Sequence, residues 1–435
     1  MGYEMSEIGE LIRRVRKLKG LRLEDLADEN ISPATISNVE RGVSHVRQDK
    51  MFYLLEKLGI SIEEIPTLLL EEKKEADTLK FELLFAESLQ RMGFLDEAIQ
   101  VLKRLNLPND HPFAPSVYWL IGGTYLLQKR YQKAERSLSE AIRLSKQSDY
   151  AMNENIEAYS FNDLGLCSYH ENNIEQAIQY TRSGLDAFNV NGKNKIVKYN
   201  LIRNLAVYLE RTGRVVEALR VVQDVWEEVP NIGQKETVLG FYWLKGELLR
   251  RSGSLKEAEI TCQEGLKLAG YNEDYSSSFD LWVVLGSIFM DKRNWEKAEG
   301  CFEIALKIAE KYVSDSRLVR GYIQLGQLKT RREGWEEAEQ ILKKAIGKGE
   351  ELSCVPYLLD AYLAMGDLYL IQRNLEKATY YYKMVIAKPH GYKEKERQAW
   401  FQLAKCWKGR DEEEFRRCTE NMFELEEEME GGELA

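Results

Sequence analysis

Residues 286–298, GSIFMDKRNWEKA, begin with a glycine and end with an alanine twelve positions later, and this frame recurs along most of the chain. Similar stretches stand at 326–338, GQLKTRREGWEEA, and at 366–378, GDLYLIQRNLEKA. The small residues at the first position are Ala86, Gly122, Gly165, Ala206, Gly246, Gly286, Gly326 and Gly366. The alanines at the last position are Ala98, Ala134, Ala177, Ala218, Ala258, Ala298, Ala338 and Ala378.

Each unit reads as two antiparallel helices joined by a short turn. An apolar helix contains the small residue, a polar turn follows, and the second helix contains the alanine. This pattern resembles the tetratricopeptide repeat, whose period is ~34 residues and is longer here. Because no single pair can bury its apolar side alone, the resemblance implies eight stacked pairs over residues 79–390. We expect an all-α, right-handed superhelix with a concave face.

The composition is that of an intracellular helical protein. The chain has 435 residues, a formal net charge of −10 and eight prolines, most of them between the expected helices. It contains no run of 18 apolar residues and no charged segment leading into an apolar signal core. We therefore expect a cytoplasmic protein that has no membrane partner.

Catalytic and metal-binding motifs are missing from the sequence. The six cysteines form no CxxC pair, which favours buried thiols. The four histidines are scattered, and no HExxH, Walker loop or nucleophile elbow occurs. We expect a binding protein rather than an enzyme, with no catalytic residues, no metal and no other cofactor.

Residues 1–65 lack the repeat and have the pattern of a DNA-binding domain. Ser32 is placed to cap a helix that begins at Pro33, where a missing N–H costs nothing. Ile36 and Val39 point inward, which leaves short polar side chains facing outward near the helix start. A protein that reads the major groove presents such a helix.

The stretch from Leu26 to Gly42, with ATISNVERG at its centre, resembles the helix-turn-helix of Cro and cI repressors. Its short turn, ADENIS, is similar to that of the Rgg and PlcR regulators, and Leu23 stands where the family often has a glutamine. The resemblance implies a bracing pair between Arg16 and Glu40. The implied DNA contacts are Pro33, Ala34, Thr35, Ser37, Asn38, Arg41, His45 and Arg47.

The charge of this domain is balanced. Residues 1–60 contain ten Lys/Arg and ten Asp/Glu. Contacts with phosphate supply most of the non-specific affinity of a DNA-binding protein. One copy should therefore bind double-stranded DNA weakly, and an operator should require a homodimer or a higher homo-oligomer.

The first helix of each pair should line the concave face, so side chains near the small residues should project into a groove. Side-chain amides can bond both the N–H and the C=O of an extended peptide. Trp243 and Val284 should add an apolar pocket beside them. The expected peptide contacts are Asn162, Asp163, Asn200, Arg203, Asn204, Trp243, Glu247, Val284, Gln324 and Gln327.

A helix-turn-helix followed by long-period tetratricopeptide repeats resembles the RRNPP family of peptide-pheromone receptors, and the length and repeat number are most similar to its NprR branch. The resemblance implies a quorum-sensing transcription regulator whose re-imported short linear peptide binds the concave face. Inner-helix asparagines hold the peptide backbone in that family, and Asn162 and Asn204 match them by position. The implied divisions are a helix-turn-helix domain (1–65), a linker (66–78), the repeats (79–390), and capping helices with an acidic tail (391–435).

Two alternative functions stay open. Rap proteins of the same family act on a phosphorelay response regulator, and Gln90, Gln128 or Gln132 could position a water there. The repeats could instead be a scaffold for other proteins, although the first units lack the lysines and asparagine of a two-carboxylate clamp. The sequence leaves open the operator, the peptide, the oligomer number and whether the peptide activates or represses.

Overall fold

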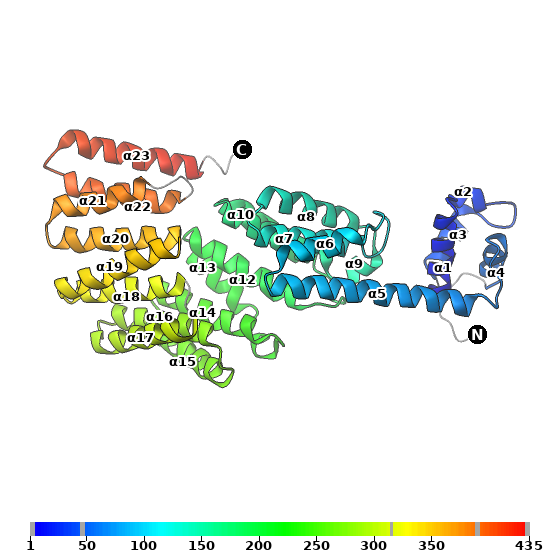
Figure 1. Ribbon diagram of the computed structural model, residues 1–435, viewed down its shortest axis with the longest axis horizontal. Helices are drawn as coiled ribbons and strands as arrows, with labels where there is room; N and C mark the ends of the chain where they lie inside the picture. Colours follow the sequence, from blue (N-terminus) through cyan, green and yellow to red (C-terminus); the bar gives the residue numbers. More distant parts are fainter. Residues whose placement is uncertain (1–4, 44–47, 314–315, 388–391, 431–435) are drawn as a thin grey trace. The chain divides into compact units, whose positions relative to one another are not determined.

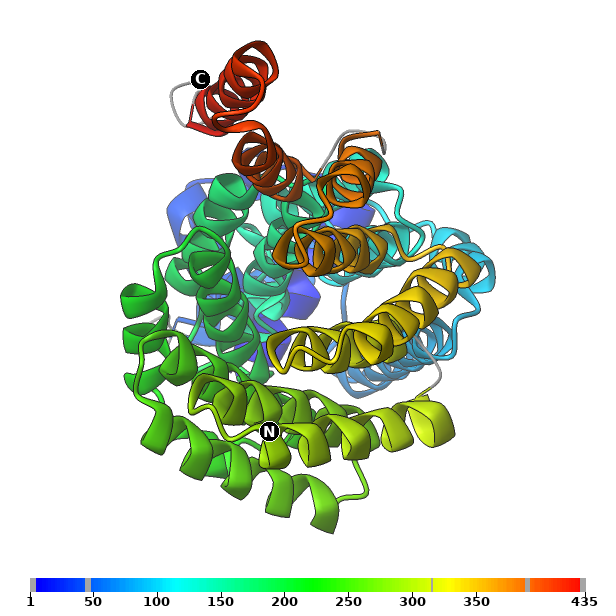
Figure 2. The ribbon, with the colours of Figure 1, turned by 90° about the vertical axis from the view of Figure 1, so that its left-hand side faces the viewer.

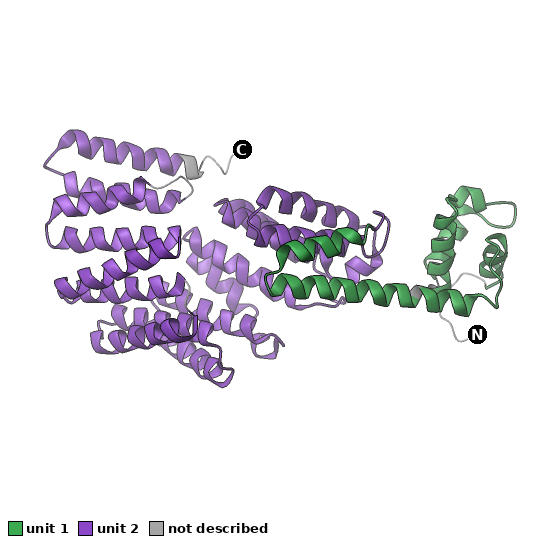
Figure 3. Cartoon of the chain, in the orientation of Figure 1, with its two compact units in different colours: residues 1–106 green, residues 107–435 purple. Residues whose placement is uncertain are grey.

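The computed structural model describes residues 5–43, 48–313, 316–387 and 392–430. Nearly all of these residues are helical, and within them an isolated bridge between Asp28 and Ile31 is the only β pairing (Figure 1). The chain divides into two compact units, residues 1–106 and 107–435 (Figure 3). None of the described helices is long and apolar enough to cross a membrane. The prediction of an all-α chain, with a helix-turn-helix before paired helices, is confirmed.

Unit 1 begins with four short helices around one core, which we call the head. These are α1 (Met5–Leu18), α2 (Leu23–Leu26), α3 (Pro33–Glu40) and α4 (Gln48–Lys57). Ile12, Ile36 and Leu54 are completely buried where α1, α3 and α4 meet. Leu23, at the position of the family's glutamine, packs against this core. Helices α5 (Ile65–Arg91) and α6 (Leu95–Arg104) complete the unit.

Residues 66–78, which we expected as a linker, form the first half of α5. Pro66 stands in the first turn of the helix, where proline is tolerated, and good helix formers follow it. Leu68 and Leu69 pack against the head core, and Glu75 forms an ion pair with Arg14 of α1. This segment is therefore helical and contacts the head.

Unit 2 consists of helix pairs that follow one another along a curve (Figure 2). Its first helices are α7 (Ala114–Leu127), α10 (Ile156–His170), α12 (Ile196–Arg211), α14 (Lys235–Arg251), α16 (Tyr275–Asp291), α18 (Ser316–Arg331), α20 (Val355–Ile371) and α22 (Lys393–Trp407). Its second helices are α8 (Tyr131–Ser145), α11 (Ile174–Asp186), α13 (Val215–Gln223), α15 (Leu255–Tyr271), α17 (Trp295–Ile308), α19 (Trp335–Glu351), α21 (Leu375–Ile386) and α23 (Glu412–Glu430). The short elements α9 (Asp149–Asn153), η1 (Val229–Asn231) and η2 (Ala309–Val313) lie between pairs.

The small residue of each first helix faces the second helix of its own pair. A β-carbon added at Gly246 would lie 2.5 Å from Sγ of Cys262, and one added at Gly286 would lie 2.5 Å from the Phe302 ring. The alanines at the last position of the frame are completely buried in all eight helix pairs. The frame read from the sequence is thus the contact surface between the two helices of a pair.

The turn inside each pair has a common backbone. The residue seven positions after the small residue has a positive φ in every unit, at Gly93, Lys129, Asn172, Gly213, Gly253, Arg293, Glu333 and Arg373. The next residue caps the second helix, and Asn173, Asn294 and Asn374 do so by accepting a hydrogen bond from a backbone N–H. This recurrent turn gives the pairs a similar geometry.

The α22–α23 pair extends the frame into the C-terminal region. Cys406 and Cys418 stand 40 residues after Gly366 and Ala378, and only 2% and 1% of their surfaces are exposed. The helices that we expected as caps therefore form a ninth pair, with cysteines in place of the small residues. The acidic α23 is the last described helix of the stack.

The first helices form the inner layer of unit 2. Successive first helices contact one another from α7 to α22, whereas each second helix packs between its own first helix and the next one. Helices that contact their counterparts in both neighbouring pairs lie on the tighter side of a curved stack. We call the surface made by the first helices the concave face.

Gly366→Ala should destabilise unit 2, because the added β-carbon would overlap the Tyr382 ring. Tyr382 cannot easily move, since it is completely buried and its hydroxyl donates to Asp367 at 2.7 Å. Overpacking of this kind costs ~1–3 kcal/mol. Gly347→Ala in α19 is the matched control, since nothing lies within 4 Å of its added β-carbon, and it should stabilise the helix by ~0.5–1 kcal/mol. Denaturant unfolding that shows the same stability for both variants would contradict the close approach.

Candidate functional site

The outward face of α3 presents short polar side chains at its N-terminal end. Ser32 caps the helix by accepting the N–H of Thr35 at 3.2 Å, and Pro33 is the first helical residue. Ile36 and Val39, 0% and 2% exposed, fix the rotation of the helix in the head. The face left open to a ligand consists of Pro33, Ala34, Thr35, Ser37 and Asn38, as the sequence predicted.

Arg41 extends this face at the end of α3. Its guanidinium donates to Asn38 Oδ1 at 2.6 Å and to the Ser37 carbonyl at 3.3 Å, and the side chain is exposed. The positive charge is therefore available to a phosphate beside the polar face. His45 and Arg47, the other two expected DNA contacts, lie outside the described residues.

Asp28 ties the short turn before α3 to α4, a contact that the sequence did not reveal. Its Oδ1 accepts the N–H groups of Asn30 and Ile31, and its Oδ2 accepts the Lys57 ammonium and the Tyr53 hydroxyl, both at 2.5 Å. The hydrogen bond from Lys57, followed by that from Tyr53, holds the pKa of Asp28 well below its usual range. These bonds fix the position at which α3 begins.

Arg16 and Glu40 form the pair that the resemblance implied. Arg16 Nε lies 2.5 Å from Glu40 Oε1 and its Nη2 lies 2.9 Å from Oε2, with both residues less than a tenth exposed. A third donor, Nη1, reaches the Leu21 carbonyl at 2.8 Å. The hydrogen bond to Glu40 raises the pKa of Arg16. The pair thus joins the end of α3 to α1.

Polar side chains on the concave face bond to one another across repeats. Trp119 donates its indole N–H to Asp163 Oδ2 at 2.8 Å, and Asn204 donates to Asn162 Oδ1 at 2.9 Å. In each bond, one partner lies three residues before the small residue of its own repeat. The other partner lies two residues before the small residue of the following repeat. Asn162 also donates to Asp163 Oδ1 at 3.1 Å, so these four residues form one chain, which we call the polar ladder.

The ladder changes the roles expected of the two asparagines. Both the Nδ2 and the Oδ1 of Asn162 bond inside the ladder, whereas no described residue donates to Asn204 Oδ1. Their exposed fractions are 8% and 9%. Asn204 Oδ1 therefore has no donor among the described residues, and Asn162 fixes the orientation of Asn204.

The other expected contacts differ in their accessibility. Arg203 and Trp243 are half-buried neighbours of the ladder on α12 and α14, and Asn200 accepts a long hydrogen bond of 3.4 Å from Thr237. Gln324 and Gln327 are half-buried on α18 and form no side-chain hydrogen bond with a described residue. Val284 is only 1% exposed and packs in the core of α14 to α17, so a ligand would not reach it without rearrangement.

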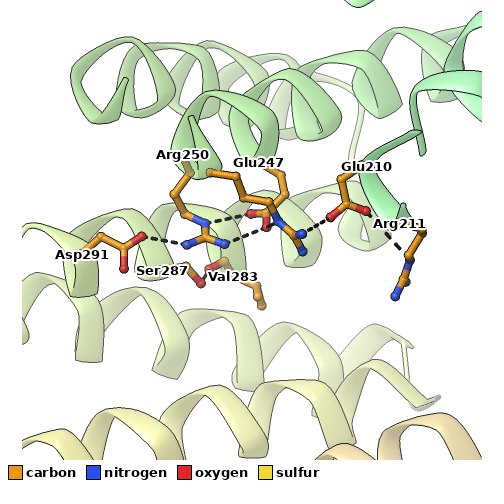
Figure 4. A network of polar contacts seen from close by, with 8 residues as sticks. Glu210, Arg211, Glu247, Arg250, Val283, Ser287 and Asp291 are labelled. Carbon is orange, nitrogen blue, oxygen red and sulfur yellow. Dashed lines mark hydrogen bonds and ion pairs between the residues drawn. The ribbon is translucent and has the colours of Figure 1, made fainter. Parts of the chain in front are cut away.

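Glu247 belongs to a network of ion pairs at the ends of α12, α14 and α16 (Figure 4). It accepts Arg250 and Arg251, both at 2.8 Å. Arg250 reaches Asp291 at 2.7 Å, and Arg251 reaches Glu210 at 2.6 Å. These bonds lower the pKa of Glu247 against the raising effect of burial. Glu247 therefore takes part in ion pairs that link three repeats. The sequence signal for this network was the presence of opposite charges four or five positions after successive small residues, at Glu210, Arg250, Arg251 and Asp291.

Between about pH 4 and pH 6, Asp163 should make unit 2 less stable as pH rises. Burial raises the pKa of Asp163 from 3.8 to about 6, so the native state binds the proton more tightly than the unfolded chain. The contribution to stability is fully present below pH ~4 and is lost as pH rises through ~6, a change of ~2–3 kcal/mol. Urea unfolding at several pH values should show this loss in the parent and not in Asp163→Asn. The same pH slope in both proteins would remove Asp163 from the account.

Among the described residues, no three His, Cys, Asp or Glu side chains gather in a way that could hold a metal ion. The described cysteines are free thiols, and five of the six are buried. The concave face and α3 thus offer hydrogen bonds and charges, which suit the binding of a polar ligand.

Comparisons with protein families match three parts of the chain. Residues 12–65 match the helix-turn-helix family, and residues 83–149 and 277–347 match tetratricopeptide-repeat families. No curated protein sequence matched the chain.

Three solved structures with a similar fold have TM-scores above 0.5. A Rap protein complexed with Competence and Sporulation Factor has a TM-score of 0.59 at 12% identity, covering 82% of this chain and 99% of that one. The apo form of the quorum sensor NprR from B. thuringiensis has a TM-score of 0.55 at 16% identity, covering 85% and 98%. The apo form of RapI has a TM-score of 0.53 at 16% identity, covering 67% and 99%. The chain thus contains a helix-turn-helix domain followed by tetratricopeptide repeats, and its fold is similar to those of the Rap and NprR structures.

Proposed function

We propose that this chain is a cytoplasmic, peptide-responsive transcription regulator of the RRNPP kind. Its head binds operator DNA as a homodimer or a higher homo-oligomer, and a short linear peptide binds the concave face. The observation that carries the proposal is the presence, in one chain, of a capped helix with an open polar face and of the polar ladder on the inner helices. A quorum sensor with a similar fold supports the same reading.

The peptide would bind along the first helices of repeats three to seven. Asn204 offers a carbonyl oxygen to a peptide N–H, while Gln324 and Gln327 offer amides further along the face. A bound peptide would span several first helices and favour one spacing between them. It can shift the arrangement of the repeats only by binding one state more tightly than another. Such a shift would change the oligomeric state and hence the placement of two heads on DNA.

Asn204→Ala should weaken peptide binding modestly, and the double variant with Asn162→Ala should weaken it about tenfold or more. Each amide–backbone bond contributes ~0.5–1.5 kcal/mol, and removal of Asn162 also frees the orientation of Asn204. Calorimetry with synthetic peptides copied from the small open reading frame beside the gene measures both effects. Asn191→Ala, at an exposed loop position, is the control.

Mass measurement with and without peptide tests the second half of the proposal. Peptide should change the oligomer mass of the full chain. If none of the neighbouring peptides binds, or if the double asparagine variant binds as well as the parent, the concave face is not a pheromone site.

Action on a response regulator is a second candidate function. The likeness to the Rap structure covers 99% of that protein, so nearly the whole backbone fold of a Rap protein has a counterpart here. Loss of phosphate from phosphorylated response regulators of the same cell, followed with and without this protein, tests the idea. No acceleration with any regulator would leave DNA and peptide binding as the function.

A further inference from the structure

The polar ladder does not continue beyond Asn204. Arg203 and Trp243, at the corresponding donor positions of the next two repeats, have no acceptor among the described residues. Arg203 occupies the position of Asn162 in the following repeat, and it lies against α14 at Gly240, where an added β-carbon would be 3.4 Å from its Nη1. One turn further along α14, the position that Asn204 and Asp163 occupy in earlier repeats is taken by the buried Leu244. Arg203 consequently forms no hydrogen bond or ion pair with any described residue.

Trp243 repeats the same situation one repeat later. It occupies the position of Trp119, whose indole N–H bonds Asp163, but the corresponding residue of the next repeat is the apolar Val284. The Trp243 indole nitrogen is buried and has no partner among the described residues. A buried donor without an acceptor is costly, and the Trp243 nitrogen is such a donor. The half-buried Arg203 guanidinium likewise has no hydrogen-bond or ion-pair partner among the described residues.

The Arg203 guanidinium and the base of the Trp243 side chain lie close together. Gly240 and Trp243 are three residues apart on one helix, so their β positions are ~5–6 Å apart. Because the guanidinium of Arg203 rests on Gly240, it stands about one helical turn from the base of the Trp243 side chain. Glu236 is the carboxylate that interacts with Arg203 electrostatically, and it is exposed and does not bond to it.

We propose that Arg203 and Trp243 form a carboxylate-binding subsite on the concave face. A guanidinium donates two parallel bonds to a carboxylate, and an indole N–H can only donate, so an acceptor-only anion satisfies both groups. A carboxamide would turn its own N–H groups toward one of these donors. A short peptide carries such a group at its C-terminus or on Asp and Glu.

The subsite deepens the proposed function, on which its physiological meaning rests. Asn204 directly follows Arg203 in the chain, so a peptide whose carboxylate meets Arg203 places a neighbouring backbone amide near Asn204. The subsite would therefore fix the direction and the register of the peptide. It predicts that active peptides have a carboxylate at one defined position.

A probe that does not depend on the pheromone tests the subsite. The full chain is labelled with ¹⁵N at its eight tryptophans, and the Trp243 indole signal is assigned by its loss in Trp243→Phe. N-acetyl-leucine should shift this signal and bind about tenfold more tightly than N-acetyl-leucinamide, as a charge-assisted bond implies. Arg203→Met should abolish the preference, Arg203→Lys should keep part of it, and the control Arg220→Met, on the exposed side of α13, should not alter it.

Equal binding of the acid and amide probes by the parent, or an unchanged preference in Arg203→Met, would overturn the subsite. If the acid probe binds and no peptide does, the subsite stands and the peptide-receptor function fails. Where a peptide does bind, its free-acid and amidated forms separate a C-terminal carboxylate from a side-chain one. Peptides in which Asp is replaced by Asn, or Glu by Gln, test the side-chain carboxylates in the same way. In the comparison where loss of a carboxylate weakens binding, Arg203→Met should weaken only the peptide that carries that carboxylate.

Discussion

Glu40→Ala is expected to unfold the head and leave the helix pairs of unit 2 folded. The change removes two charge-assisted bonds and leaves the Arg16 guanidinium in a site that is only 9% exposed. Breaking a buried ion pair by removing one partner costs ~3–5 kcal/mol. Since small domains have stabilities of ~5–15 kcal/mol in total, a four-helix head should lose most of its margin.

Hydrogen exchange of the full chain, followed peptide by peptide, measures this effect where it occurs. Peptides from residues 5–43 should exchange faster in Glu40→Ala, and those from residues 107–430 should not change. Glu56→Ala, at an exposed position of α4, is the control. Arg16→Met combined with Glu40→Leu should recover much of the loss, because apolar residues of similar size often replace a buried pair without cost. Unchanged exchange in the head of Glu40→Ala would show that the pair does not brace it.

The helix pairs were predictable because close contact between two helices requires a small residue at a fixed position in each repeat. Only a small side chain fits at Gly286 against the Phe302 ring, and the same restriction returns every 40 residues in the second half of the chain. The ninth pair was missed as a repeat because Cys406 and Cys418 replace the glycine and alanine. Both cysteines are small and fully enclosed, so they satisfy the same packing requirement.

The concave face was predicted as a surface but not in its internal bonds. A list of outward positions does not show that the residue three before one small residue meets the residue two before the next. That diagonal register turns Asn162 into a partner of Asn204 and buries Val284 in the core. The same register leaves Arg203 and Trp243 without acceptors. From the sequence, both residues were expected only as peptide contacts on the concave face.

The helical structure of residues 66–78 depends on tertiary contacts that the sequence does not show. The leucines and charges of this segment fit a helix as well as a flexible segment, and Leu68, Leu69 and Glu75 decide between the two by contacting the head. The hydrogen bonds of Tyr53 and Lys57 to Asp28 could not be predicted for the same reason, since these residues lie 25 and 29 positions after Asp28 in the sequence. Contacts of this range leave no local pattern.

Thr35→Ala combined with Asn38→Ala should weaken specific DNA binding strongly while the head stays folded. Both side chains lie on the open face of α3, and each contact with a base edge contributes ~1–3 kcal/mol of discrimination. Two lost contacts therefore imply a loss of ~2–6 kcal/mol, or roughly thirtyfold to more than ten-thousandfold in affinity. The core of the head should be unaffected, because Ile36, Val39 and Glu40 face the other side. Fluorescence anisotropy on an operator selected from genomic fragments measures the loss.

The salt dependence of binding separates base reading from phosphate attraction. Log affinity falls with log salt in proportion to the number of neutralised phosphates. Thr35→Ala with Asn38→Ala should lower affinity at every salt concentration without changing that slope, because neither side chain carries a charge. Arg41→Ala should instead reduce the slope by ~1 and weaken specific and random DNA alike. Thr78→Ala on α5 is the control, and a double variant that binds the operator like this control across all salt concentrations means that α3 does not read bases.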